Sequence, residues 1–218
     1  MPSDAIGRAP QGVDVAERTQ ARTGQGTARE AAQQTAQGTA QDAAQGRYPR
    51  PVVSAAEAEW IWRRLSSAAM EDGAKPETVR LAVVVGLARA SGARYGGLLR
   101  CTVSALDLDA GWVTLEHGKH RVPRRHGLDR GTVLVLRRWL RVRQELCAEL
   151  AGSVPDALLL TVHHTHDNGV TVAAGLPITR QGLVLSWRRF VHRTNARYAG
   201  RRPPLPTRFE QVRRVWDT

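Results

Sequence analysis

Cysteine, lysine and long apolar runs are scarce in this sequence, and each scarcity excludes a class of protein. The two cysteines, Cys101 and Cys147, are too few for the disulfide framework of a small secreted domain, so we expect buried free thiols in a reducing cytoplasm. No run approaches the roughly 18 apolar residues of a membrane span, and the N-terminus has no apolar core of the signal-peptide type. The sequence therefore predicts a soluble, cytoplasmic protein that does not contact membranes.

Large apolar side chains are almost absent from the first 50 residues. Residues 35–46 instead carry a short repeat, TAQG-TAQD-AAQG, which offers no face to bury. A linker with two prolines follows at residues 48–51. We therefore expect residues 1–50 to form a disordered low-complexity tail and residues 51–218 to form one folded domain.

Acidic residues are the minority charge, and the imbalance lies in the folded part. The formal net charge is +12; residues 1–50 hold six arginines against five acidic residues, which leaves 26 Lys and Arg against 15 acidic residues for residues 51–218. Only Lys75 and Lys119 of those 26 are lysines. Because a guanidinium suits two-point contacts to phosphate, the composition favours a nucleic-acid-binding surface over a merely soluble basic one.

Helix signals are clear in the first part of the folded domain. Ser54, with Glu57 three residues later, has the capping-box pattern that begins a helix. Pro76 and Gly92 bracket a second helix that is apolar nearly all round, as expected of a central buried helix. A short helix is expected to follow Arg94.

Two longer amphipathic helices are expected later in the chain. The first covers residues 131–150, with Leu136 facing inward and arginines, including Arg143, facing out. The second begins at a Thr179 cap and places its arginines opposite an apolar face that includes Trp187.

Between the short helix after Arg94 and the helix at residues 131–150, the chain changes to strand patterning. Residues 106–123 alternate and turn like a small antiparallel sheet, with turns at residues 109–111 and 117–119, and Lys119 lies at the tip of the second turn. A strand-like LLLTV segment follows later, at residues 158–162. Helices around one small three-stranded sheet predict a mostly helical α+β fold.

Arg94 and Lys119 are the residues best placed for chemistry. Arg94 follows a buried helix at a glycine-rich turn, so it could grip a phosphate, or it could simply cap the carbonyl groups of that helix. Lys119 could donate a proton or a positive charge to a phosphate, or it could be a solvated turn residue. Residue types and spacing leave both pairs of alternatives open.

Four motifs in a fixed order resemble the tyrosine recombinase, or phage integrase, family. GARYGGLLRCTVSALDLD at residues 92–109 is similar to the family pattern T-G-L-R-x-S/G-E-L-L-x-L-x-W-x-D-I-D-L. It is followed by a hairpin with G-K-x-R-V-P at residues 118–123, a long helix, and G-x-P-I-T-R-Q-G at residues 175–182. The resemblance covers the catalytic domain of the family, from about residue 51 to the end of the chain.

The resemblance implies a tyrosine-recombinase catalytic-domain-like fold and assigns three catalytic positions. Arg94 corresponds to the first catalytic arginine, Lys119 to the β-hairpin lysine, and Arg213 to the second arginine. In the family, the arginines hold the scissile phosphate, the lysine protonates the leaving 5′-oxygen, and a tyrosine attacks to form a 3′-phosphotyrosine. The resemblance implies neither a metal nor any other cofactor.

The sequence departs from the family pattern at several positions. Glu210 stands where a His or Lys is expected, which brings a carboxylate to a phosphate site, and Gly97 replaces the usual acidic residue near the first arginine. The sequence stops at Thr218, and neither Tyr95 nor Tyr198 matches the position of the nucleophile. Strand cleavage by this chain alone is therefore not expected.

Further arginines and one histidine cluster complete the candidate residues. The arginines expected to contact DNA follow the hairpin lysine or lie on the last long helix: Arg121, Arg124, Arg125, Arg180, Arg188, Arg189 and Arg193. Residues 163–167, HHTHD, have metal-ligand side chains, but they crowd one loop without a distant partner, so we expect a solvated loop and no metal.

Three functions remain in view. The first is an integrase-like protein that binds double-stranded DNA without cutting it, as a relic of a mobile element or a regulatory partner of an intact recombinase. The second is part of an active DNA recombinase or integrase, completed in trans by other recombinase subunits or by a longer reading frame. The third is a non-DNA scaffold whose arginines bind an acidic protein.

Overall fold

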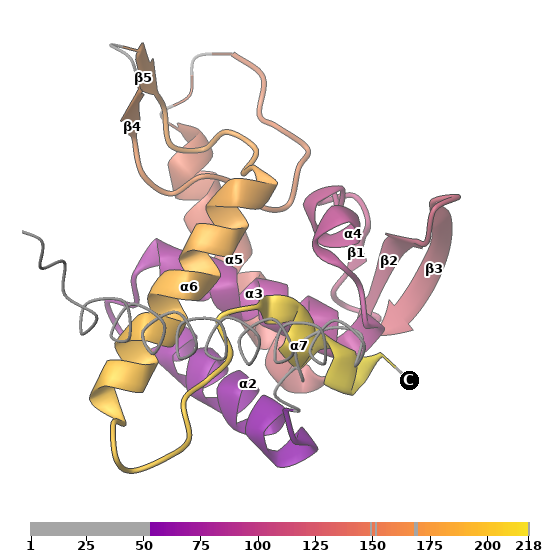
Figure 1. The fold of residues 1–218 in the computed structure, drawn as a ribbon. Helices are drawn as coiled ribbons and strands as arrows, with labels where there is room; N and C mark the ends of the chain where they lie inside the picture. The colour runs from indigo at the N-terminus through magenta and orange to yellow at the C-terminus, as the bar shows by residue number, and fades with distance from the viewer. Residues whose placement is uncertain (1–52, 149, 151, 168–169, 218) are drawn as a thin grey trace, which may run out of the picture. The chain divides into compact units, whose positions relative to one another are not determined.

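The computed structural model describes residues 53–148, 150, 152–167 and 170–217. Helix α3 (Pro76–Ser91) lies in the middle of this region and contacts α2 (Ala55–Met70), α5 (Arg130–Ala148) and α6 (Arg180–Arg197) (Figure 1). The expected tail, residues 1–50, lies outside the described residues. The mostly helical α+β fold with a three-stranded antiparallel sheet is confirmed.

The two ends of helix α3 follow the signals in its sequence. Pro76 occupies its first turn, where a missing backbone N–H removes no helical hydrogen bond. Gly92 ends the helix in the left-handed conformation (φ 64°) and donates its N–H to the Ala88 carbonyl. Residues 81–88 are buried on every side of the helix, which explains its lack of a polar face.

Helix α2 begins at the predicted cap. The Ser54 hydroxyl accepts a hydrogen bond from the Glu57 N–H at 3.1 Å. The helix buries Ile61, Trp62 and Leu65 against α3, and it contacts α5 as well. Its interior face therefore matches the apolar spacing of the sequence.

The sheet has the order β1-β2-β3, with strands β1 (Leu106–Asp107), β2 (Trp112–His117) and β3 (Val122–Gly127). Alternation in β2 buries Val113 and Leu115, which is the pattern of a strand with one face on the core. The short helix α4 (Tyr95–Leu99) contacts β2 and lies beside the sheet (Figure 1). The sheet thus holds the Lys119 turn near the end of α3.

Helix α5 contradicts one prediction. Arg143 is buried rather than outward-facing, and it donates hydrogen bonds to the carbonyl oxygens of Pro155 and Ala157. These loop carbonyl groups take the place of water as hydrogen-bond acceptors, so the guanidinium has partners inside the protein. Trp139 is fully buried and donates its indole N–H to the Leu158 carbonyl at 2.8 Å.

The segment after α5 also differs from the prediction. Residues 158–162 form no strand; Leu160 makes an isolated bridge with Pro177. The strands form instead at β4 (Thr165–Asp167) and β5 (Val170–Val172), which pair with each other. Leu158, Leu159 and Leu160 are all buried, so the apolar run serves the core without a strand partner.

The chain then continues into α6, the short helix α7 (Phe209–Arg213) and a 3-10 turn, η1 (Arg214–Trp216). The Thr179 hydroxyl caps α6 by accepting from the Gly182 N–H at 3.1 Å, as predicted. Cys101 and Cys147 are buried free thiols, which confirms their predicted state. No helix among the described residues is both long and apolar enough to cross a membrane.

Candidate functional site

A cleft of about 920 Å³ opens where α3 ends, between α4, the β2–β3 turn, α6 and α7. Its lining includes the three predicted catalytic residues, Arg94, Lys119 and Arg213, although they are far apart in the sequence. The ends of several elements meet here, so side chains from different parts of the sequence line the same cleft. The cleft is the candidate functional site.

Arg94 owes its place to the turn that follows α3. Gly92 reverses the chain in the left-handed conformation, and Arg94 then occupies the N-cap position of α4 in extended conformation. Its side chain is exposed and makes no hydrogen bond to a carbonyl group of α3 among the described residues, where the Gly92 carbonyl accepts from Arg213 instead. Arg94 therefore does not tie itself to the carbonyl groups of α3, the alternative that the sequence left open.

Gly97 brings α4 close to the sheet. A Cβ at this position would lie 2.7 Å from the backbone carbonyl oxygen of Glu116 in β2. No larger side chain fits there without a shift of one backbone relative to the other. Where the family pattern has an acidic residue, this chain thus has Gly97, which lets the backbones of α4 and β2 touch directly.

Lys119 lies in the turn between β2 and β3, whose strand pairing ends at His117 and Val122. The turn contains Arg121 in the left-handed region (φ 53°), an uncommon conformation for a residue with a side chain. Lys119 is exposed and lines the cleft opposite α6 and α7. The hairpin therefore presents one ammonium group to the space that Arg94 faces.

Helix α6 contributes two further cations from one side. Arg180, Val184 and Arg188 are four residues apart, which aligns them along one stripe of the helix, and all three line the cleft. Within the described residues, no carboxylate lies within ion-pair distance of Arg94, Lys119, Arg180 or Arg188. Three separate elements thus supply positive charge that forms no ion pair among the described residues.

Arg213 is bound quite differently. Its side chain is 2% exposed, and it donates two hydrogen bonds to the Glu210 carboxylate, from Nη2 at 2.7 Å and from Nε at 2.9 Å. Nη1 donates to the Gly92 carbonyl at 2.6 Å and forms an ion pair with Asp217 at 2.8 Å. Because Glu210 binds this guanidinium, the pKa of the carboxyl is lowered and that of Arg213 is raised.

Tyr95, which the sequence places beside Arg94, also lines the cleft. Its ring stacks on Phe209 of α7, with ring centroids 5.1 Å apart. Burial raises the pKa of the Tyr95 hydroxyl strongly, and the negative charge of Glu210 raises it further. The phenolate form needed for nucleophilic attack is therefore disfavoured at this position.

The balance of charge in the cleft is positive. Seven cationic side chains line it against three carboxylates, a net of four positive charges. All three carboxylates are in ion pairs, since Glu116 binds Arg100 at 2.5 Å and the other two bind Arg213. His117 adds no charge near neutral pH, because burial and Arg124 lower its pKa. Such a cleft suits a polyanion.

The predicted DNA-contacting arginines fall into three places. Arg180 and Arg188 line the cleft; Arg121, Arg124 and Arg125 are exposed on the β3 hairpin beside it. Arg189 and Arg193 instead line a separate groove, between α6 and helices α2 and α3. The cleft also holds two arginines that the sequence analysis did not single out, Arg100 and Arg208.

The histidine-rich loop does not form a metal site in the part of the chain that is described. There, no group of three or more His, Cys, Asp or Glu side chains is arranged to hold a metal ion. His163 lies 3.2 Å from the Glu77 carboxylate, and the His164 ring accepts a hydrogen bond from the Ala174 N–H at 3.4 Å. The side chains of residues 165–172 lie outside the description.

Comparison with known proteins places this chain in a family. Residues 62–218 match the sequence model of the phage integrase family. The chain belongs to the phage integrase family. The predicted resemblance to this family is confirmed, and the matched range includes all four motifs. No curated protein matches the chain in sequence.

Several solved structures are similar in fold. They include the XerA recombinase, with 18% identity and a TM-score of 0.49, covering 79% of this chain and 51% of that one. The XerH site-specific recombinase bound to difH substrate has 16% identity and a TM-score of 0.49, covering 77% and 42%. The Tn1549 transposon integrase in complex with a circular intermediate DNA has 14% identity and a TM-score of 0.45, covering 78% and 53%. The chain spans about half the length of these proteins.

Proposed function

We propose that this integrase-family domain binds double-stranded DNA and holds a backbone phosphate in the cleft. The observation that carries the proposal is the convergence of Arg94, Lys119, Arg180 and Arg188, from three elements, without carboxylate partners among the described residues. Phosphate contacts supply most of the affinity of such proteins for duplex DNA. The exposed arginines of the β3 hairpin extend the same positive surface.

In this proposal the phosphate is held without Arg213. Its guanidinium already donates to Glu210 and Gly92 and pairs with Asp217, so binding a phosphate would require breaking those interactions. Arg213 acts instead as an anchor that ties α7 to the end of α3. Arg94 and Lys119, the remaining catalytic positions of the family pattern, are free to contact DNA.

Strand cleavage is not assigned to the residues of this cleft. Tyr95 is the tyrosine that lines it, and its raised pKa makes it a poor nucleophile. The alternative, an active recombinase, needs another tyrosine from a partner subunit or a longer chain. A nicked suicide substrate distinguishes the two, because a covalent protein–DNA adduct forms only when a nucleophile reaches the phosphate.

Fluorescence anisotropy with a duplex of about 30 base pairs tests DNA binding, with affinity measured over a range of salt concentrations. We expect Arg94→Ala and Lys119→Ala each to weaken binding for all sequences and to lower the salt slope by about 1. Arg137→Ala is the matched control, because Arg137 is exposed on α5 and paired with Asp109. Equal affinity and slope for all three variants and the unmodified chain would contradict the proposal.

A further inference from the structure

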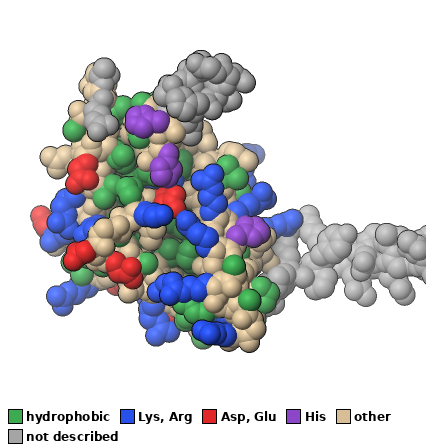
Figure 2. Space-filling view, turned by 90° about the vertical axis from the view of Figure 1, so that its left-hand side faces the viewer, with side chains coloured by type: hydrophobic (Ala, Val, Ile, Leu, Met, Phe, Trp, Pro, Cys, Tyr) green, Lys and Arg blue, Asp and Glu red, His purple; other side chains and the backbone are tan. Residues whose placement is uncertain are grey.

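The arginines of α6 separate onto two surfaces. Arg189, Arg193 and Arg197 follow one another at four-residue intervals and form a second stripe, distinct from the stripe that faces the cleft. This second stripe lines a groove, closed on its other side by α2 and α3. Figure 2 shows a face of the molecule on which many Lys and Arg side chains lie among exposed hydrophobic side chains and fewer acidic ones.

The floor of this groove is apolar. Leu65 of α2, Leu81 of α3 and Phe190 of α6 contribute to it, and the first two are almost completely buried. The hollow measures about 220 Å³. Small-molecule sites usually measure roughly 300–1,000 Å³, so this one better fits an inserted side chain.

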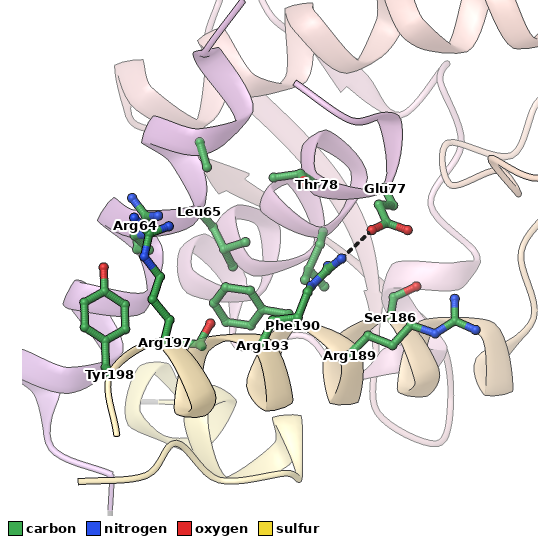
Figure 3. A pocket seen from close by; sticks show the side chains of 13 residues that line it. Arg64, Leu65, Glu77, Thr78, Ser186, Arg189, Phe190, Arg193, Arg197 and Tyr198 are labelled. Atoms are coloured by element: carbon green, nitrogen blue, oxygen red, sulfur yellow. Dashed lines mark hydrogen bonds and ion pairs between the residues drawn. The ribbon is translucent and has the colours of Figure 1, made fainter. Parts of the chain in front are cut away.

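Several arginines around the rim of the groove are not neutralised by an ion pair among the described residues. Glu77 forms an ion pair with Arg193 at 3.0 Å, so Arg193 is already neutralised, and the His163 ring lies 3.2 Å from the same carboxylate. Arg64, Arg189 and Arg197 have no carboxylate within ion-pair distance among the described residues. Figure 3 shows Arg64 and Arg197 at one end of the groove and Arg189 at the other, with the Glu77–Arg193 pair between them.

We propose that this groove binds an acidic segment of a partner protein, with one apolar side chain of the segment inserted between Leu65 and Phe190. Carboxylates of the segment pair with Arg64, Arg189 and Arg197, the three arginines of the groove that form no ion pair among the described residues. A DNA backbone fits the groove less well, because it has no apolar group for the hollow. The proposal does not depend on DNA binding in the cleft.

Anisotropy of a fluorescein-labelled peptide tests the proposal on the whole chain. The probe has about 16 residues of Glu and Ala, with two leucines four residues apart, and its twin has serine in place of both leucines. We expect the leucine peptide to bind about tenfold more tightly than its twin, because only leucine fills the hollow. Failure of the leucine peptide to bind, or equal binding of the twin, overturns the proposal.

Two variants with matched charge changes locate the binding. Arg64→Glu with Arg197→Glu reverses two charges in the groove, and we expect it to weaken peptide binding about tenfold or more. Arg180→Glu with Arg188→Glu reverses two charges in the cleft, and it should leave the peptide affinity within about twofold of the original. Circular dichroism confirms that both variants fold. Equal loss in both variants overturns the proposal.

Duplex binding by the same variants separates this proposal from the proposed function. The cleft variant should lose duplex affinity, whereas the groove variant should keep most of it. If the groove variant loses duplex affinity as strongly as the cleft variant, the groove arginines contact DNA, and the acidic-segment proposal fails. If neither variant affects duplex binding while the peptide result holds, the proposed function fails and the groove proposal stands.

Discussion

The guanidinium of Arg213 and the carboxylate of Glu210 form a two-point ion pair three residues apart on α7, at 2.7 and 2.9 Å. The pair is partly buried, since the Arg213 side chain is buried whereas the Glu210 side chain remains 40% exposed. Glu210 stands at the position where the family pattern has His or Lys. An internal anion therefore binds the arginine that the resemblance assigned to a phosphate.

Replacing Glu210 tests this pairing. We expect Glu210→Gln to lower the free energy of unfolding in urea by about 2 kcal/mol, because Arg213 keeps its contact with Gly92 but loses a charged acceptor. Loss of a carboxylate near Arg94 should also tighten duplex binding about two- to fivefold. Glu145→Gln, an exposed α5 variant with the same charge change, is the control. If both variants keep the original stability and have equal duplex affinity, the Glu210–Arg213 ion pair contributes to neither stability nor DNA binding.

Arg213 itself should matter more for stability than for binding. Arg213→Met removes the tie between α7 and the Gly92 carbonyl and leaves that acceptor unsatisfied, so we expect a loss of about 3–5 kcal/mol in urea unfolding. Duplex affinity measured well below the unfolding midpoint should change little. A large loss of affinity in a fully folded variant would return Arg213 to the phosphate site.

Two neighbouring glycines of α4 make a matched pair. In Gly97→Ala the new Cβ meets backbone 2.7 Å away, so we expect a loss of about 1–3 kcal/mol and weaker binding through a displaced hairpin. In Gly96→Ala the nearest atom is the flexible end of Arg100 at 3.3 Å, so stability should hold or rise by up to about 1 kcal/mol. Similar melting temperatures for the two variants would contradict the close approach of α4 to β2.

A pair of histidines should make the domain sensitive to mild acid. His117 and His126 lie with ring centroids 4.7 Å apart, and their Nε2 atoms are buried without hydrogen-bond partners. Burial lowers the pKa of both, and Arg124 lowers both further, whereas Asp217 partly opposes the shift at His117. Because the folded state resists protonation, stability should fall as pH drops below about 6.5, the pKa of the unfolded side chains.

Melting temperatures at about pH 7.5 and about pH 5 measure this loss. The lowered carboxyl pKa values of Glu77, Asp129 and Glu210 act at lower pH, so they do not contribute in this window. His126→Phe keeps an aromatic ring without a titrating group, and it should reduce the difference between the two temperatures. An equal difference in the variant and the original chain would assign the acid sensitivity to other groups.

The cap of α6 is a simpler test of local structure. Thr179→Ala removes the hydroxyl that accepts from the Gly182 N–H, so we expect a loss of about 1 kcal/mol in unfolding free energy. Thr179→Ser keeps the acceptor and should retain most of the stability. If the serine variant loses as much as the alanine variant, the methyl group and not the cap is responsible.

Much of the fold could be predicted because its signals are local. The Ser54 and Thr179 caps, the Pro76 start and Gly92 end of α3, and the hairpin before Lys119 each depend on a few neighbouring residues. The prediction was wrong where contacts outside the helix decided the outcome. Arg143 is polar and lies at an outward spacing, yet the loop that follows α5 folds back over it and accepts its hydrogen bonds through the carbonyl groups of Pro155 and Ala157.

The sequence by itself determined the family, through four motifs in order, and marked Arg94, Lys119 and Arg213 as residues of one site. Only the tertiary structure decided how those residues behave, because ion pairing and burial depend on elements that meet in space. It places Arg94 and Lys119 in a cleft without an ion pair to any described carboxylate, ties Arg213 to Glu210, and divides the arginines of α6 between two surfaces. Helical spacing shows which arginines share one face of a helix, but it does not show which other elements lie against that face. Those surrounding elements decide whether an arginine can contact a phosphate or serves as a structural anchor.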